Sequence, residues 1–426
     1  MLCYFDSDAE VNLSHITDIK QVRSLTELKN RLSESNFEFT QSTEYTQQGL
    51  YIIEVSKIPN LWCAKTFPKS FNLLLNIPSR VIRAVQSKNI RILILSIVEG
   101  DNFTSDVFDG FGHLHNTVRL LGLPKHAVLI VSGNLNASQQ YTEWCKNNSK
   151  EEYIEFQEGV EWDGKESHPP SAMVKIQDYS LPFNSLNRSH RNHRTEHLYF
   201  LAENKLQGLV SGGAWFATHT IELPIYQTVE YNHYNTVLTA NYPKTIDVQD
   251  LVNQVPNLIN NLEIYERSQL TVVTESHFNQ TGGLFITEKT FRPLLVGHPF
   301  MVLGQKGTLK KLRSWGFKTD FDGIDQSYDD VANDSDRFLQ FHQSLRTWCL
   351  QDLEIRRTAI YKWNNIIQHN FQTLLENIKS TNDIMTLFQI LVLCGIWGHK
   401  NHLLITNMLL LHSHHTLVKM LTLILL

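Results

Sequence analysis

The stretch TESHFNQTGGLFITEKTFRPLLVGHPFMVLG (Thr274–Gly304) begins at the end of one apolar run and contains the next. A polar loop with Gly282 and Gly283 comes first, a helix start at Thr287 follows, and the apolar run His298–Gly304 ends the stretch. Short runs that are apolar throughout, separated by helix-length segments, indicate β-α-β units with parallel strands. This stretch therefore predicts an α/β domain in the second half of the chain.

The first half of the chain carries the same alternation. RILILSIVEGD (Arg91–Asp101) precedes a helix-length segment at Val107–Leu121, and HAVLIVSGN (His126–Asn134) precedes another that begins at Ala137. LPFNSLNR (Leu181–Arg188) then opens the second block. Two separate alternations predict two Rossmann-like α/β domains, each built on a parallel sheet.

The domain organisation follows from where the two alternations stop. The glycine and the paired prolines of EWDGKESHPP (Glu161–Pro170) make this segment the best linker candidate. The spacing of polar and apolar residues in Asp352–Ile378 predicts one helix that crosses back over the first domain. We therefore expect an N-terminal domain at 1–170, a second domain at 180–350, a crossing helix at 351–379 and an apolar tail at 380–426.

The tail contains three apolar runs, at Leu387–Trp397, Leu403–Leu411 and Met420–Leu426. None reaches the roughly 18 residues that a helix needs to span a bilayer. Three interpretations stay open for this tail. It could form interfacial helices that contact a membrane peripherally, form helices that pack on the protein, or be a terminus that is not native to the fold.

Charge and cysteine content exclude several classes of function. Lys and Arg number 38 and Asp and Glu 43, so the formal net charge is 38 minus 43, or −5, and any anion site must be local. The five cysteines are scattered and never spaced as CxxC, which argues against a disulfide framework and against a zinc knuckle. Acidic residues near the start replace the basic segment of a secretory signal, so we expect a cytoplasmic protein.

The helix start at Thr287 is a candidate anion site. A helix N-terminus at the carboxyl edge of a parallel sheet offers unpaired N–H groups and the positive end of the helix dipole, which together favour a diphosphate. Lys289 would add a full positive charge. The alternative is that Glu288 and Lys289 are ordinary first-turn residues, since Glu is common there for dipole reasons.

This stretch resembles the donor-binding motif of the α-1,3-fucosyltransferase family. In that motif a Phe-Glu-Asn-Ser element precedes Tyr-(Val/Ile)-Thr-Glu-Lys and a helix. Thr274–His277 (TESH) stands at the first element and Phe285–Lys289 (FITEK) at the second. The family's hydrophobic-Pro-hydrophobic order is replaced by His298-Pro299-Phe300.

The resemblance implies a fold and a set of donor contacts. The fold is GT-B, with two Rossmann-like domains facing a cleft and here a C-terminal helical tail, so that 180–350 binds the donor and 1–170 the acceptor. Glu288 would bond the ribose or sugar hydroxyls of the donor, and Lys289 its phosphates. Glu275 and Thr287 would belong to the same donor site.

A second charged cluster lies in SLNRSHRNHRTEHLYFLAENKL (Ser185–Leu206). Arg188, Arg191 and Arg194 are spaced by three, so in a helix they would line one face near its start. Arginine forks bind phosphate oxygens, which would make such a cluster useful. In GT-B transferases an arginine after the first strand of the second domain supports the leaving diphosphate, and this segment, with Asn187, has the same place in the chain. A solvated basic patch and a nucleic-acid contact are the alternatives.

A catalytic base should come from the first domain. Glu99 ends RILILSIVEGD, at the carboxyl end of a predicted parallel strand, where α/β folds place their ligands. A partly shielded carboxylate there could have the raised pKa of a general base. Asp101 and His113 compete for this role, and Glu99 could instead simply cap a turn with Gly100.

We expect neither a metal nor a cofactor. The Asp-x-Asp patterns at Asp6, Asp320 and Asp334 do not follow a strand as a metal-dependent transferase would require. The histidines of the tail lack accompanying Cys or carboxylate ligands. Charge on a departing diphosphate would then be met by Arg, Lys and helix N–H groups.

The leading hypothesis is a glycosyltransferase that moves a sugar from a nucleoside diphosphate sugar, with GDP-sugar favoured, to a hydroxyl of a glycan or other acceptor. We expect inversion and no metal. One alternative is a binding module that kept the nucleotide pocket and lost catalysis. The other is a nucleic-acid-interacting protein that uses the Arg188–Arg194 cluster, which the net charge disfavours.

Overall fold

The computed structural model describes residues 2–5, 38–41, 49–54, 73–96, 103–105, 108–159, 173–176, 181–187, 189–213, 216, 221–243, 262–279 and 283–393. Several predicted features lie outside these described residues: Glu99, Asp101, Arg188, Gly282, the linker Glu161–Pro170 and the tail beyond residue 393.

In the described part of the first half, six strands form one sheet in the order β2-β1-β3-β4-β7-β8. Every neighbouring pair is parallel, as the register Ile92↔Val128 illustrates for β4 and β7. The strands are β1 Leu2–Phe5, β2 Glu38–Gln41, β3 Gly49–Glu54, β4 Ile90–Ser96, β7 Val128–Ser132 and β8 Ile154–Glu158. β1 ends directly before Asp6 in the sequence, so the expectation that no Asp-x-Asp pattern follows a strand was wrong for this one.

Helices and a small hairpin accompany this sheet. They are η1 Leu73–Asn76, α4 Ser79–Gln86, α5 Gly110–Leu120 and α6 Ala137–Asn147, with the antiparallel pair β5 Thr104–Ser105 and β6 Phe108–Asp109. α5 begins where the Asp109 side chain accepts a hydrogen bond from the backbone N–H of Gly112, which is the arrangement of a helix N-cap. Buried aliphatic and aromatic side chains of the strands and helices form one hydrophobic core.

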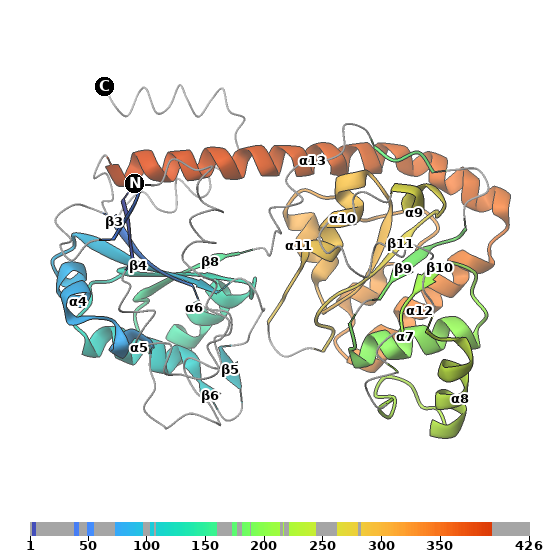
Figure 1. The fold of residues 1–426 in the computed structure, drawn as a ribbon, viewed down its shortest axis with the longest axis horizontal. Helices are drawn as coiled ribbons and strands as arrows, with labels where there is room; N and C mark the ends of the chain where they lie inside the picture. Colours follow the sequence, from blue (N-terminus) through green and yellow to red (C-terminus); the bar gives the residue numbers. More distant parts are fainter. Residues whose placement is uncertain are drawn as a thin grey trace.

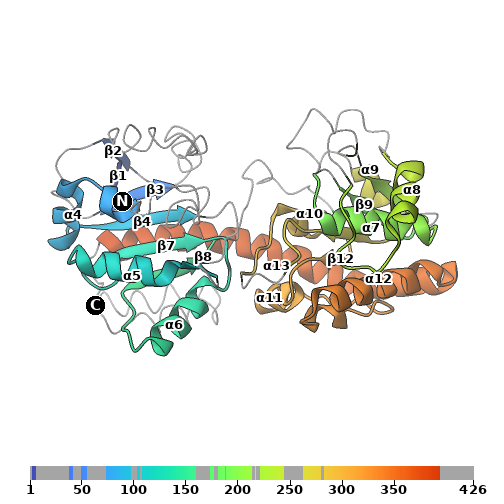
Figure 2. The same cartoon turned by 90° about the horizontal axis from the view of Figure 1, so that it is seen from below.

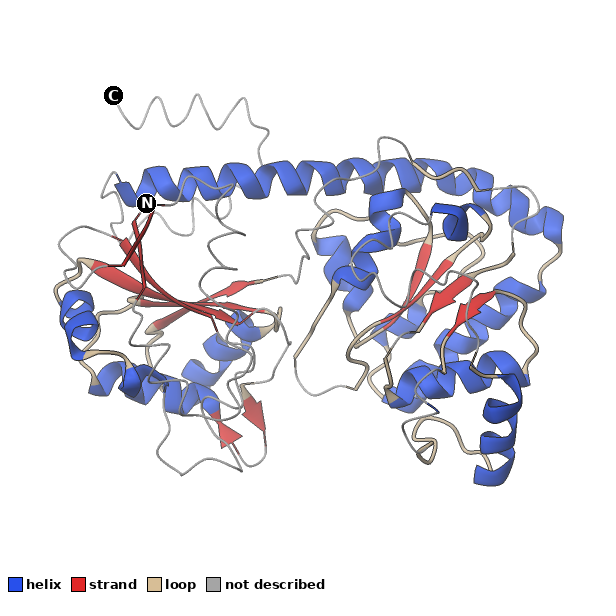
Figure 3. Cartoon of the chain, in the orientation of Figure 1, coloured by secondary structure: helices blue, strands red, loops and turns tan. Residues whose placement is uncertain are grey.

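The second half contains a separate sheet, in which the described strands have the order β10-β9-β11-β12 and are all parallel. They are β9 Asn184–Leu186, β10 Leu209–Ser211, β11 Thr271–Thr274 and β12 Phe300–Leu303. The accompanying helices are α7 Asn192–Glu203, α8 Tyr231–Asn241, α9 Leu262–Glu266, α10 Glu288–Val296, α11 Thr308–Ser314, η6 Ser327–Asp330 and α12 Asp334–Leu350. Figure 3 shows helices on either side of this sheet. The predicted α/β class with parallel sheets is confirmed.

The strand–helix–strand unit β11-α10-β12 forms as its sequence predicts. Every residue of the two strands is buried, which is what apolar runs in a covered parallel sheet require. α10 ends at Gly297, whose φ of 65° is left-handed. A Cβ at this position would lie 2.7 Å from the Met173 side chain, so both the turn and the close packing need glycine.

The last described element, α13 Leu353–Leu393, is a long helix. Figures 1 and 2 show it running from the second sheet past the first. Its first part packs on the second core through Trp363, Ile367 and Leu374. The expected end of this helix near Ile378 was wrong, because the helix continues to Leu393, within the first apolar run of the predicted tail. Among the residues that the structure describes, no helix is both long and apolar enough to cross a membrane.

The two halves touch at the carboxyl edge of the first sheet. The Leu135 backbone N–H, just after β7, donates to the Leu284 carbonyl over 2.8 Å, and the Leu284 N–H donates to Asn134 Oδ1 over 3.3 Å. Leu135 is 4% exposed and belongs to the hydrophobic core of the second half. These two hydrogen bonds therefore connect the end of β7 to the loop that leads into α10.

Candidate functional site

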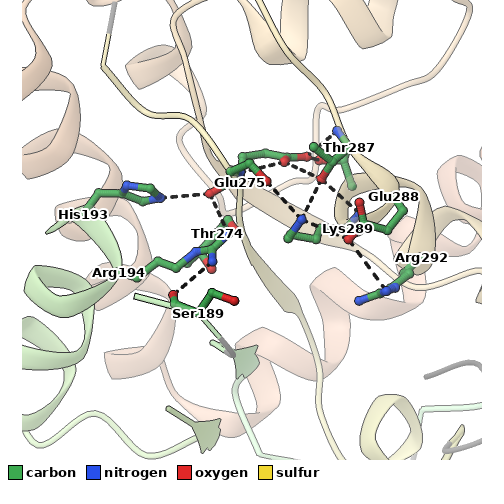
Figure 4. A network of polar contacts seen from close by, with 11 residues as sticks. Ser189, His193, Arg194, Thr274, Glu275, Thr287, Glu288, Lys289 and Arg292 are labelled. Carbon is green, nitrogen blue, oxygen red and sulfur yellow. Dashed lines mark hydrogen bonds and ion pairs between the residues drawn. The ribbon is translucent and has the colours of Figure 1, made fainter. Parts of the chain in front are cut away.

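The carboxylate of Glu275, the residue after β11, organises the start of α10. It is fully buried and accepts hydrogen bonds from the Ser276 N–H, from both the N–H and the hydroxyl of Thr287, and from the hydroxyl of Thr290. The Thr287 hydroxyl lies 2.7 Å from the carboxylate. These bonds hold the end of the strand and the first turn of the helix together (Figure 4).

Thr287 is the N-cap of α10 and Lys289 lies in its first turn. The Thr287 side chain accepts from the Lys289 N–H, which is the bond expected of an N-cap threonine. The Lys289 ammonium lies 2.9 Å from Glu288 Oε1, 3.1 Å from Thr287 Oγ1 and 3.2 Å from Ser276 Oγ. Its side chain is 27% exposed. A partly accessible ammonium thus stands at the positive end of a helix.

Glu288 is the acidic neighbour of this ammonium. Its carboxylate pairs with Lys289 and lies 3.8 Å from the guanidinium of Arg292. Burial favours the neutral acid, but the charge and hydrogen bond of Lys289 and the charge of Arg292 outweigh it and hold the pKa of Glu288 below its ordinary value. Glu288 is therefore an anion at neutral pH.

Arg194 reaches the same strand end from α7. Its guanidinium is buried and donates to the carbonyl oxygens of Thr274 at 3.0 Å, Glu275 at 2.9 Å and Ser189 at 3.1 Å. Burial lowers the pKa of Arg194 to about 10, so it stays charged at neutral pH. Arg194, Glu275 and Lys289 therefore meet at the end of β11, although some 80 to 95 residues separate Arg194 from the other two.

The prediction that three arginines line one helical face was wrong. α7 begins at Asn192, so Arg191 is its extended N-cap residue, with φ −158° and ψ 143°, and is exposed. Arg194 lies in the first turn and is buried, because the carbonyl oxygens at the end of β11 supply acceptors there. Arg188 lies outside the described residues. The predicted contact of Arg194 with a phosphate stays a prediction. In this structure its guanidinium donates to backbone carbonyl oxygens.

The side-chain amide of Asn187 also forms its hydrogen bonds within the protein, at the edge of the sheet. Its amide oxygen accepts from the Thr274 hydroxyl at 2.7 Å, and its amide nitrogen donates to the Ser185 hydroxyl at 3.1 Å. The side chain is buried and ties the end of β9 to the end of β11. Asn187 and Glu275 thus support the edge of the sheet, and their predicted contacts with a donor stay untested.

A cavity of about 380 Å³ lies beside this network. The start of α7, the loop after β11 and the segment before α8 form its walls. Its lining residues are His190, Arg191, Asn192, His193, Glu222, Ile225, Tyr226, Ser276, His277, Phe278 and Asn279. This volume is in the range of small-molecule sites. Ser276 lines the cavity and accepts from the Lys289 ammonium, so the cavity and the α10 site share this residue.

The wall from the segment before α8 was not predicted from the sequence. Its backbone is held by Glu196 of α7, whose buried carboxylate accepts from the N–H of Ile225 at 2.6 Å and of Tyr226 at 2.9 Å. Burial raises the pKa of Glu196 to about 7, although these hydrogen bonds oppose the rise. A glutamate in the middle of a helical pattern was the one available signal, and it did not reveal its partners.

The first domain contributes fewer described candidates. His113 is exposed on α5, while Glu99 and Asp101 lie outside the described residues, so a catalytic base there stays a prediction. Within the described ranges, no group of three or more His, Cys, Asp or Glu side chains could hold a metal ion.

Comparison with models of protein families and with curated proteins finds no match for this chain. The fucosyltransferase resemblance therefore rests on the residues of its motif alone. Two solved structures are distantly similar in fold. The DNA-modifying enzyme β-glucosyltransferase, studied with and without uridine diphosphoglucose, is 9% identical with a TM-score of 0.35, over 82% of this chain and 99% of that one. Anabaena HepE, in complex with UDP and glucose, is 12% identical with a TM-score of 0.30, over 89% and 100%.

Proposed function

We propose that the chain transfers a sugar from a nucleoside diphosphate sugar to an acceptor hydroxyl. One observation carries the proposal: the partly exposed Lys289 ammonium stands at the N-terminus of α10 and donates to Ser276, which lines a cavity together with Arg191. Two cations and a helix N-terminus at the carboxyl edge of a parallel sheet suit a diphosphate. The cavity that Ser276 and Arg191 line, of about 380 Å³, is in the size range of small-molecule sites.

Donor binding breaks the ion pair between Lys289 and Glu288. A phosphate oxygen replaces the Glu288 carboxylate as the partner of the ammonium. Glu288 then accepts hydrogen bonds from neutral hydroxyls of the ribose or sugar, because a carboxylate and a phosphate repel each other. The motif shared with the α-1,3-fucosyltransferase family favours GDP as the nucleotide and fucose or another hexose as the sugar.

The proposed transfer inverts the anomeric carbon. The acceptor oxygen forms a bond to this carbon, the bond to the diphosphate oxygen breaks, and the acceptor proton passes to a base, for which Glu99 is the candidate. The leaving diphosphate takes the electron pair of the broken bond. Lys289, Arg191 and the positive end of the α10 dipole meet its charge, so the proposed reaction needs no metal.

A thermal-shift screen against GDP, UDP, ADP, CMP and TDP in EDTA tests the donor class. A ligand that binds only the folded state raises the melting temperature, by an amount that grows with its concentration relative to Kd. We expect a nucleoside diphosphate, with GDP first, to raise the melting temperature more than CMP does. No shift with any nucleoside diphosphate at millimolar concentration would contradict the proposal.

A further inference from the structure

The imidazole of His193 is held in one orientation between the α10 site and the cavity. Nε2 lies 2.9 Å from the carbonyl oxygen of Glu275. The ring is stacked on Phe278, with centroids 5.6 Å apart and planes 25° from parallel. Only 4% of the residue is exposed, yet it forms part of the cavity wall.

The partners of this ring determine which nitrogen carries its proton. A carbonyl oxygen only accepts, so Nε2 must donate to Glu275, and Nδ1 of the neutral ring keeps its lone pair. Burial and the charge of Arg194 lower the pKa of His193 to about 3, so the ring is neutral at pH 7. Among the described residues, none donates a hydrogen bond to Nδ1. His193 therefore retains an unused acceptor.

The other groups of the cavity narrow the class of ligand. Arg191 brings positive charge and only donates hydrogen bonds, which suits a phosphate. An acceptor lone pair beside it suits a hydroxyl. We propose that His193 is a ligand-binding residue whose Nδ1 accepts a hydrogen bond from a hydroxyl of a phosphorylated sugar. This inference rests on the proposed function only in taking that sugar to be the ribose or hexose of the donor.

Two substitutions distinguish the hydrogen-bond acceptor at Nδ1 of His193 from the packing of its aromatic ring. His193→Phe keeps an aromatic ring beside Phe278 and removes both nitrogens, while Arg194 still donates to the Glu275 carbonyl. His193→Asn places an amide oxygen close to the position of Nδ1. Binding of GDP, UDP, ribose 5-phosphate and inorganic pyrophosphate is measured by calorimetry, and melting of the free variants checks their folding.

The acceptor role predicts a specific pattern of affinities. His193→Phe should weaken the hydroxyl-bearing ligands by about 2- to 13-fold, the range for one neutral hydrogen bond. His193→Asn should recover part of this loss. Pyrophosphate, which carries no sugar, should bind all three proteins alike. Nitrogen-15 spectra should show Nδ1 of His193 without a proton at pH 7.

The outcomes distinguish this inference from the proposed function. If the wild type binds a nucleoside diphosphate and His193→Phe binds it equally well, the inference fails and the proposed function stands. Binding of ribose 5-phosphate that depends on His193, without binding of any nucleotide, would leave the inference standing and remove the proposed function. An equal loss of pyrophosphate affinity, or a proton on Nδ1, would overturn the inference. Both fail if no phosphorylated sugar binds.

Discussion

Glu275 shows what a sequence motif leaves open about a single side chain. The sequence motif assigns it to donor binding, whereas the structure surrounds its carboxylate with donors from residues 276, 287 and 290. A motif gives the order of residues in the sequence, but it does not say whether a side chain contacts a ligand or other groups of the protein. That choice depends on where α10 begins relative to β11, which is a tertiary feature.

Glu275→Gln should destabilise the second domain. The amide would place an N–H group against donors and would weaken several charge-assisted hydrogen bonds, each worth about 1.5 to 3 kcal/mol. We expect a loss of about 3 kcal/mol or more in the free energy of unfolding, measured by urea denaturation. Glu288→Gln is the matched control, because its partly exposed ion pairs contribute about 1 kcal/mol or less. Equal effects of the two substitutions would contradict the structural role of Glu275.

The helix α7 contributes to three parts of the site. Its N-cap residue Arg191 lines the cavity, its first turn carries His193 and Arg194 to the end of β11, and its second turn carries Glu196 to the cavity wall. α7 spans Asn192–Glu203, so Arg191 precedes its first turn. The arginine face was mispredicted because spacing by three assumes that the helix begins before Arg188.

The buried Glu196 carboxyl makes the stability of this region depend on pH. Its pKa is raised to about 7 in the folded protein from an ordinary 4.5, so the folded state binds this proton more tightly than the unfolded chain. The resulting stabilisation is complete below pH 4.5 and is lost as pH rises toward 7. Its upper limit is about 3 kcal/mol, at 1.36 kcal/mol for each pKa unit.

Urea denaturation at several pH values between 4.5 and 8 measures this dependence. Comparison with Glu196→Gln removes the contribution of every other titrating group, since both proteins share those groups. The wild type should lose stability relative to the glutamine variant as pH rises from 4.5 to 7, and the difference should then level off. Parallel curves for the two proteins would show that Glu196 titrates at its ordinary pKa.

Along the whole chain, the alternation of apolar and helical segments predicted two parallel sheets, because each strand–helix unit is encoded locally. The contact of Leu135 and Asn134 with Leu284 could not be predicted in this way, since it depends on how the halves pack. The length of α13 was underestimated for a local reason. No glycine or proline follows Ile378 until Gly395, so nothing in the sequence ends the helix there.

The proposed diphosphate site around Lys289 is formed by two segments that lie about 100 residues apart in the sequence. Calorimetry of the best-binding nucleoside diphosphate against wild-type protein, Lys289→Ala and the exposed-surface control Lys310→Ala tests it most directly. Lys289→Ala should lose about 1.5 to 3 kcal/mol of binding free energy, the range for a hydrogen bond to a charged group, while its folding survives. Lys310→Ala should bind like the wild type. An unchanged affinity of Lys289→Ala for every nucleotide that the wild type binds would contradict the account.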